Sequence, residues 1–162
     1  MLKRRTQYRG HCQCCGRLQA VRNGHVSAHG YTIKNGWCEG VCGGHFYPPI
    51  EDSREHADKV IKSVRDQVAD LLEKSEAAML GAHDPETFVS GHHYVYEPRF
   101  ERVETVKPFS EASFTENGYI RRDISQKFER RARAGTQFAN ALSELVEDHH
   151  GHSLISVEIV CQ

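Results

Sequence analysis

The chain has 162 residues, of which 38% are hydrophobic and 27% are charged, and its formal net charge is -1. This length suits one domain, or a small domain with an appendage. No apolar run approaches the roughly 20 residues that a membrane-spanning helix needs, and residues 1–10 lack the apolar stretch of a signal peptide. These features exclude a membrane-spanning protein and favour the cytoplasm, where clustered cysteines are metal ligands more often than disulfides.

The small net charge conceals an uneven distribution of charge along the chain. Residues 1–50 contain seven Lys or Arg and one acidic residue, whereas residues 51–162 contain 14 Lys or Arg and 21 acidic residues. A basic segment joined to an acidic one suggests that the basic part binds a polyanion, although two opposite segments can also neutralise each other. The candidate partner-binding residues are Lys3, Arg4, Arg5, Arg9, Arg17 and Arg22.

The first 50 residues are predicted to form a small module rich in glycine and cysteine. Residues 1–10 are expected to be a mobile basic arm or an edge strand, and Asn35-Gly36 indicates a tight turn. Pro48-Pro49 closes the module, because proline continues neither a helix nor a central strand. The short predicted strands are residues 18–21, 26–28 and 31–34.

Residues 53–80 are predicted to form a helix. Asp52 and Glu55 have the spacing of a capping box at its start, and Gly81 is a good C-terminal stop. One face carries small or apolar residues at alternating four- and three-residue spacing, which is typical of a coiled-coil seam. The seam consists of Ala57, Ile61, Val64, Val68, Leu71, Ser75 and Ala78.

The segment after this helix is predicted to contain two short strands and a second helix. Residues 93–97 and 99–106 are rich in β-branched and aromatic residues on either side of Pro98, which indicates strands. Residues 119–149 are predicted to be helical, and residues 154–160 alternate like a final strand. The apolar face of the second helix is Ile120, Ile124, Phe128, Ala132, Phe138, Leu142 and Leu145.

These elements predict an α+β fold with two parts. Residues 1–50 form a small zinc-stabilised N-terminal module, and residues 51–162 form a helical hairpin with a β-hairpin insertion and a C-terminal strand. Two helices of similar length, each with one apolar stripe, most simply pack antiparallel. The alternative for an exposed seam is pairing with a second copy of the chain, which would give a homodimer through the helices.

Five of the six cysteines lie between residues 12 and 42, and they predict a metal site. Cys12 and Cys15 have the C-x-x-C spacing of a zinc knuckle, with Gly16 giving the turn room. The second pair of ligands is either Cys38 with Cys42 or His29 with Cys42. Five cysteines and a histidine exceed four positions, so the surplus cysteines, Cys14 among them, are expected to be small buried hydrophobes.

A resemblance selects among these alternatives. The residues that carry it are His11-Cys12-Gln13-Cys14-Cys15-Gly16, Gln19-Ala20-Val21, His29-Gly30-Tyr31, Gly36-Trp37 and Gly40-Val41-Cys42-x-Gly44. Together they resemble a zinc-binding module of uncharacterised phage and bacterial proteins, with the skeleton C-x-x-C, Q-A, H-G-Y and G-x-C-x-G. The resemblance covers residues 11–50 and implies the ligands Cys12, Cys15, His29 and Cys42. It implies no activity, and Cys38 remains an alternative to His29.

Two other groups of residues invite a chemical interpretation. The histidines at 149, 150 and 152 form a metal site only if carboxylates lie nearby, and histidines also favour a helix C-terminus because of the helix dipole. Six basic residues crowd the first half of the second helix, where they either pair with acidic residues or contact a partner. Those six are Arg121, Arg122, Lys127, Arg130, Arg131 and Arg133.

The preferred interpretation is a non-catalytic, zinc-binding accessory protein of phage type, acting in the cytoplasm of a bacterial host. Its expected partner is a nucleic acid or a host protein complex. One alternative is an inhibitor of a host machine, such as a defence system or a polymerase, that docks through the helical hairpin. The other is a metal-dependent hydrolase or nuclease, which would need an open coordination position on its zinc.

Overall fold

A computed structural model describes residues 3–30, 40–95 and 101–161 of the chain. The chain divides into two compact units: unit 1 comprises Met1–Ala69 with Arg131–Gln162, and unit 2 comprises Asp70–Arg130. Both long helices contribute residues to both units. Within the described ranges, no helix has the length and hydrophobicity needed to cross a membrane.

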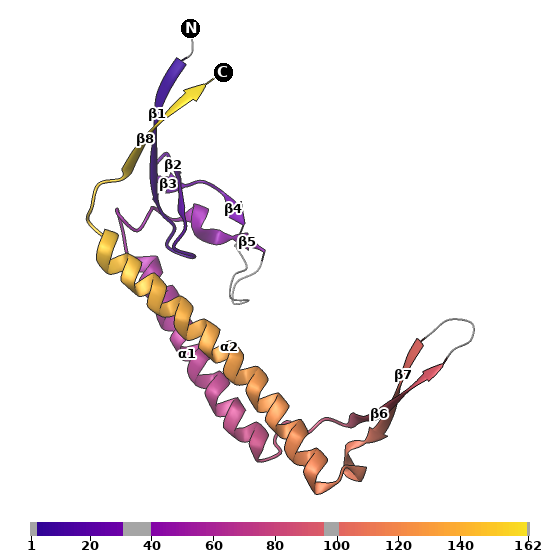
Figure 1. The fold of residues 1–162 in the computed structure, drawn as a ribbon. Coiled ribbons are helices and arrows are strands. Elements are labelled where there is room, and N and C mark those ends of the chain that lie inside the picture. Colours follow the sequence, from indigo (N-terminus) through magenta and orange to yellow (C-terminus); the bar gives the residue numbers. More distant parts are fainter. Residues whose placement is uncertain (1–2, 31–39, 96–100, 162) are drawn as a thin grey trace. The chain divides into compact units, whose positions relative to one another are not determined.

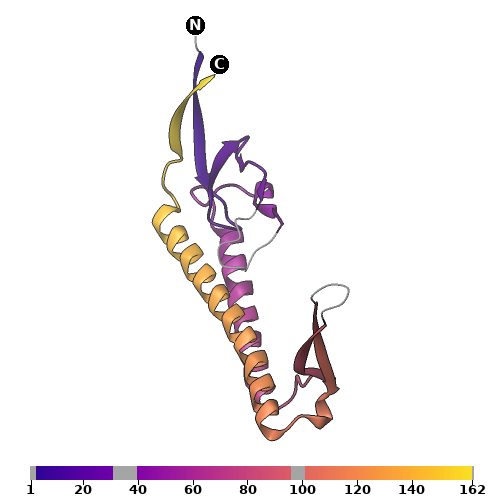
Figure 2. The ribbon, with the colours of Figure 1, turned by 45° about the vertical axis from the view of Figure 1, so that its right-hand side comes forward.

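Unit 1 is built around a four-stranded antiparallel sheet with the order β3-β2-β1-β8 (Figure 1). Strand β1 pairs with β8 from Lys3 to Arg9 and with β2 from Arg9 to His11. Of the two alternatives predicted for residues 1–10, the mobile arm is wrong and the strand is confirmed from Lys3 onward; β8 pairs with one side of this strand, and β2 joins the other side only from Arg9. Figures 1 and 2 both show β1 and β8 side by side. The strands are β1 (Lys3–His11), β2 (Leu18–Arg22), β3 (His25–Val26) and β8 (Ile155–Cys161).

A second, two-stranded sheet in unit 1 carries part of the cysteine-rich segment. Strand β4 (His29–Gly30) pairs antiparallel with β5 (Val41–Cys42), and the short 3-10 helix η1 (Gly43–Phe46) follows. The predicted strand at 31–34 and the predicted turn at Asn35-Gly36 lie outside the described residues.

Helix α1 (Glu55–Met79) and helix α2 (Phe114–His149) supply the main core of unit 1. The predicted seam positions Ala57, Ile61 and Val64 are buried on α1, where they join Leu142 of α2. This cluster also contains Ile50, which is fully buried just before α1. The periodicity therefore predicted the buried residues of α1, but among the buried α2 residues of this cluster it predicted only Leu142. The buried members contributed by α2 are Ala139, Leu142 and Val146.

Both helix starts differ from their predictions. Helix α1 begins at Glu55, so Asp52 lies outside the capping position and the predicted capping box is wrong. Helix α2 begins at Phe114, five residues before the predicted start. Ser113 and Glu116 form the capping box there: Ser113 Oγ accepts from the Glu116 N–H at 3.3 Å, and the Glu116 carboxylate accepts from the Ser113 N–H at 2.8 Å. This S-x-x-E spacing is the expected signal for a helix start.

Unit 2 contains the end of α1, the start of α2 and a β-hairpin between them. The hairpin consists of β6 (Thr87–Val95) and β7 (Glu101–Pro108), and the 3-10 helix η2 (Phe109–Glu111) follows it. The sequence predicted two strands here, but β6 begins six residues earlier than expected and contains a register shift between Val89 and Gly91. A buried hydrogen bond of 2.7 Å joins the hydroxyls of Ser75 on α1 and Ser125 on α2.

Candidate metal centre

Four donors from three separate segments of unit 1 converge near the end of β1. Cys12 and Cys15 lie in the turn after β1, His29 is in β4, and Cys42 is in β5. The register of the small sheet places His29 directly opposite Cys42. The four donor atoms all lie within 4.8 Å of one another, so the group is close enough to hold a metal ion.

The distance between two sulfurs of this group is close to that of tetrahedral coordination. The sulfurs of Cys12 and Cys42 are 3.7 Å apart, and Cys15 Sγ lies 3.2 Å from His29 Nε2. Zinc–sulfur bonds of about 2.3 Å in a tetrahedral site place two sulfurs about 3.8 Å apart. The structure thus brings together Cys12, Cys15, His29 and Cys42, the set that the resemblance implied. Cys38, the alternative to His29, lies outside the described residues.

Gly16 closes the turn that carries the first two ligands. Its N–H donates to the Cys12 carbonyl at 2.8 Å, and the N–H of Cys12 donates to the Arg17 carbonyl at 3.0 Å. Gly16 has a φ of +70°, which favours glycine. A Cβ at this position would also lie 2.6 Å from Leu145 Cδ1, so the turn packs closely against α2.

Backbone N–H groups point at the sulfurs of the cluster. Cys14 N–H donates to Cys12 Sγ, and Gly44 N–H donates to Cys42 Sγ, each at 3.4 Å. A Cβ at Gly44 would lie only 2.0 Å from Cys12 Sγ. Glycine is therefore required at position 44, because any side chain would displace a ligand. Such outer-shell hydrogen bonds orient the ligands of a metal and tune it.

The ring of His29 is oriented for coordination. Its Nδ1 lies 2.7 Å from the Ser27 carbonyl oxygen, which favours a proton on Nδ1 and leaves the lone pair of Nε2 toward Cys15. Burial acts to lower the pKa of His29. The Ser27 carbonyl and the negative charges of Cys12 and Cys42 outweigh burial, so the pKa is raised overall.

The four cysteine thiols in and around the cluster differ in pKa. Hydrogen bonds from the Cys14 and Cys15 thiols lower the pKa of Cys12 to about 6. Hydrogen bonds from the neighbouring thiols also lower the pKa of Cys42, and the hydrogen bond from Cys12 has the largest effect. The pKa values of Cys14 and Cys15 are raised, because their thiols donate to Cys12 and Cys42. Cys12 and Cys42 therefore favour the thiolate, the form of cysteine that binds a metal, whereas Cys15 favours the neutral thiol.

Cys14 is the surplus cysteine within the described part of the module. It is 8% exposed and packs in a small core with Val26, as expected for a buried hydrophobe. A raised pKa is also the opposite of what a catalytic nucleophile needs.

Gln13 is a functional residue that the sequence did not reveal. Its side chain is 1% exposed, and its Oε1 accepts hydrogen bonds from the N–H groups of His56 at 2.9 Å and Ala57 at 3.0 Å. Its Nε2 donates to the Pro48 carbonyl at 2.9 Å. Gln13 therefore satisfies two free N–H groups in the first turn of α1 from within the metal-binding turn. No periodicity or motif marks a cap that comes from 43 residues away.

A second cluster of donors in unit 1 contains His11, Glu51 and His149. Glu51 accepts the backbone N–H of His11 at 2.8 Å, and His11 Nδ1 lies 2.6 Å from Glu51 Oε1. The rings of His11 and His149 stack with centroids 4.1 Å apart and an interplanar angle of 23°. These are the distances of hydrogen bonds and ring stacking, and stacked rings do not aim their lone pairs at one point. The cluster is a buried link between β1 and the end of α2.

Most of the candidate partner-binding residues lie on the exposed surface of the sheet. Arg4, Arg5, Arg17 and Arg22 are exposed and Arg9 is half-buried, while Lys3 begins β1. Arg5 and Arg22 line one hollow of about 270 Å³ together with Tyr8, which is 54% exposed. Three of these residues have internal partners: Arg17 donates to the Gly30 carbonyl at 2.6 Å, Arg9 Nε donates to Gln7 Oε1 at 3.2 Å, and Arg4 lies 3.9 Å from Glu158.

Comparison of the chain with protein-family models, with curated proteins and with solved structures finds no match. The resemblance of residues 11–50 to a phage and bacterial module therefore remains an expectation. The function has to be inferred from the geometry of the two units.

Proposed function

We propose that this chain is a non-catalytic zinc protein in which a structural zinc ion organises a nucleic-acid-binding surface. The observation that carries the proposal is the convergence of Cys12, Cys15, His29 and Cys42, whose four donor atoms lie within 4.8 Å of one another. Structural zinc sites are four-coordinate with protein ligands, whereas catalytic sites keep one position for water. Four protein donors favour the structural role over that of a metal-dependent hydrolase.

Zinc would contribute directly to the stability of the module. The core around the site is small: the buried residues are Cys12, Cys14, Val26 and Cys42. Two of these are proposed ligands, so the metal would replace much of the apolar burial that such a short segment lacks. Because the site does not exist in the unfolded chain, the binding free energy of the metal becomes folding free energy.

The basic residues of unit 1 support a polyanionic partner. Unit 1 contains 13 Lys or Arg and 10 acidic residues, whereas unit 2 contains 8 and 12. Arg5 and Arg22 are exposed around one hollow, and neither forms an ion pair within the described ranges. Guanidinium groups in such a position bind phosphates through electrostatics and hydrogen bonds. We expect contacts to the nucleic-acid backbone and little dependence on base sequence.

Elemental analysis and binding assays together test this proposal. We expect one zinc per chain, and none in a Cys12→Ala, Cys15→Ala double variant. Labelled DNA and RNA should bind at low salt, and the affinity should fall steeply between roughly 50 and 200 mM salt. In the Arg5→Ala, Arg22→Ala variant, the slope of log affinity against log salt should become shallower by about 0.9 for each phosphate that is no longer neutralised. Arg65→Ala on α1 is the matched control, because Arg65 is also exposed. Absence of zinc, or no binding to DNA or RNA at low salt, would contradict the proposal.

A further inference from the structure

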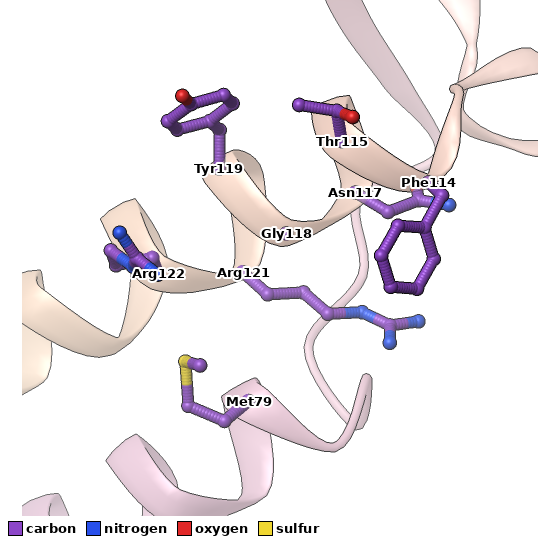
Figure 3. A pocket seen from close by; sticks show the side chains of 8 residues that line it. All are labelled: Met79, Phe114, Thr115, Asn117, Gly118, Tyr119, Arg121 and Arg122. Atoms are coloured by element: carbon purple, nitrogen blue, oxygen red, sulfur yellow. The ribbon is translucent and has the colours of Figure 1, made fainter.

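Unit 2 contains a hollow that plays no part in zinc or nucleic-acid binding as proposed above. It has a volume of about 480 Å³ and lies between the end of α1 and the first turns of α2 (Figure 3). Met79 lines it from α1, and Phe114 and Tyr119 line it from α2. We call this feature the apolar hollow.

The apolar hollow exposes large side chains that a folded chain normally covers. Phe114 is 94% exposed, Tyr119 is 66% exposed and Met79 is 46% exposed. Leu80, next to Met79 in the chain, is 84% exposed. Exposed apolar side chains gathered around one hollow are typical of an interaction site. The aromatic residues are also the residue types that dominate the binding energy of protein interfaces.

The charges around the apolar hollow identify the partner's chemistry. Arg121 is already neutralised, because its Nε donates to Asp84 Oδ1 at 2.8 Å. Arg122 also lines the hollow, is exposed, and forms no ion pair within the described ranges. The hollow therefore offers one free guanidinium beside an apolar wall, and a carboxylate is its natural counterpart.

Asn117, another lining residue, has an unused hydrogen-bond acceptor. Its Nδ2 donates to the Ala112 carbonyl at 3.4 Å, but its Oδ1 is buried and has no donor in the described part of the chain. A buried acceptor without a donor costs free energy. An N–H group of a partner, such as that of a peptide backbone, would supply the missing donor.

The electrostatics of unit 2 disfavour a nucleic acid at this position. Unit 2 contains 8 Lys or Arg against 12 acidic residues, so a chain of many phosphates would be repelled, whereas a single carboxylate next to Arg122 meets a local positive charge. We propose that the apolar hollow binds a peptide segment of a protein partner, with an aromatic or aliphatic side chain seated against Phe114 and Tyr119 and an adjacent Asp or Glu paired with Arg122. This inference is independent of the nucleic-acid surface, because all its residues lie in unit 2.

Short synthetic peptides test the proposal directly against the full, zinc-loaded chain. Three sets carry the same apolar residue flanked by Asp or Glu, by Lys or Arg, or by Asn or Gln. We expect the acidic set to bind best. Phe114→Ala should weaken this binding by at least about tenfold, the cost of removing an interface anchor. Because Phe114 is 94% exposed, this variant should fold like the parent chain. The matched control is Phe46→Ala in unit 1, where the ring is 69% exposed.

Charge reversal provides the decisive test. Arg122→Glu should shift the preference from the acidic to the basic peptide set, whereas Arg65→Ala should leave it unchanged. Equal binding of all three sets, no binding of any set, or unchanged binding by Phe114→Ala would overturn the proposal. It would also be overturned if Phe114→Ala dissociated a dimer of the chain in sedimentation, or removed binding of single-stranded DNA. Loss of nucleic-acid binding in the Arg5→Ala, Arg22→Ala variant would leave the peptide result unaffected.

Discussion

The side-chain oxygen of Gln13 accepts a hydrogen bond from the backbone N–H of Ala57, 3.0 Å away. Gln13 lies between the two ligands Cys12 and Cys15, and Ala57 lies in the first turn of α1. One side chain thus connects the metal-binding turn with the start of the helix whose seam enters the core of unit 1. Metal binding should therefore stabilise the first turn of α1, and loss of this hydrogen bond should destabilise the metal-binding turn.

Gln13→Leu should destabilise the zinc-loaded protein by about 1–3 kcal/mol. The substitution leaves two N–H groups of the first helical turn without their acceptor and removes the donor to the Pro48 carbonyl. Urea unfolding followed by circular dichroism measures the difference. Gln137→Leu, at an exposed position of α2, should change the stability by less than about 0.5 kcal/mol. Equal effects of the two substitutions would contradict the proposed role of Gln13.

Gly44→Ala should abolish or strongly weaken metal binding, whereas Gly43→Ala should not. The new Cβ at position 44 would lie 2.0 Å from Cys12 Sγ, while a Cβ at position 43 meets nothing within 4 Å. The ratio of zinc to protein, measured after dialysis, distinguishes the two variants. Full zinc retention by Gly44→Ala would mean that Cys12 does not occupy its described position in the loaded protein.

His29→Ala should lower zinc affinity by at least about 100-fold, which exceeds the 10–100-fold effect typical of outer-shell residues. Cys38→Ala should retain zinc, because His29 is already the fourth of the donors that lie within 4.8 Å of one another. Competition with a chelator of known affinity measures both variants. The opposite result, with zinc absent from Cys38→Ala and kept by His29→Ala, would favour the site with four cysteines.

Leu71→Ala and Leu142→Ala should each destabilise the protein by about 2–5 kcal/mol, the cost of truncating a buried leucine. The two side chains are 8% and 2% exposed. Leu72, the neighbour of Leu71, is 47% exposed and provides the control. Chemical unfolding should place Leu72→Ala much closer to the parent chain. A comparable destabilisation in all three variants would show that the described helical faces are wrong.

Protonation of Asp84 should weaken unit 2 at acidic pH. Hydrogen bonds from Arg121 hold the pKa of Asp84 below its usual value. The stabilising contribution is therefore present above the usual pKa of an aspartate, about 3.9, and is lost as the pH falls through the depressed value. In an NMR titration of the side-chain carboxyl, Arg121→Gln should return the pKa of Asp84 toward the usual value. An unchanged midpoint in that variant would contradict the ion pair.

The sequence by itself determined the types of the main elements and part of the core, whereas it did not indicate the buried residues Ala139 and Val146 of α2. Ala57, Ile61 and Val64 follow a spacing that requires a one-sided apolar helix, and they are buried. The C-x-x-C spacing likewise indicated two of the four donors. These features are local, because periodicity and knuckle spacing depend on residues only a few positions apart.

Tertiary structure alone decided the features that join distant segments. Strand β1 is an interior strand because residues 155–161 pair with it, and no local pattern specifies that partner. Gln13 caps α1, and Glu51 holds His11, through contacts 43–44 and 40 residues apart. His29 joins the cysteines because the pairing of β4 with β5 places it opposite Cys42. In each case the partner is selected by the geometry of the folded chain, since any glutamine, glutamate or histidine offers the same donor or acceptor atoms.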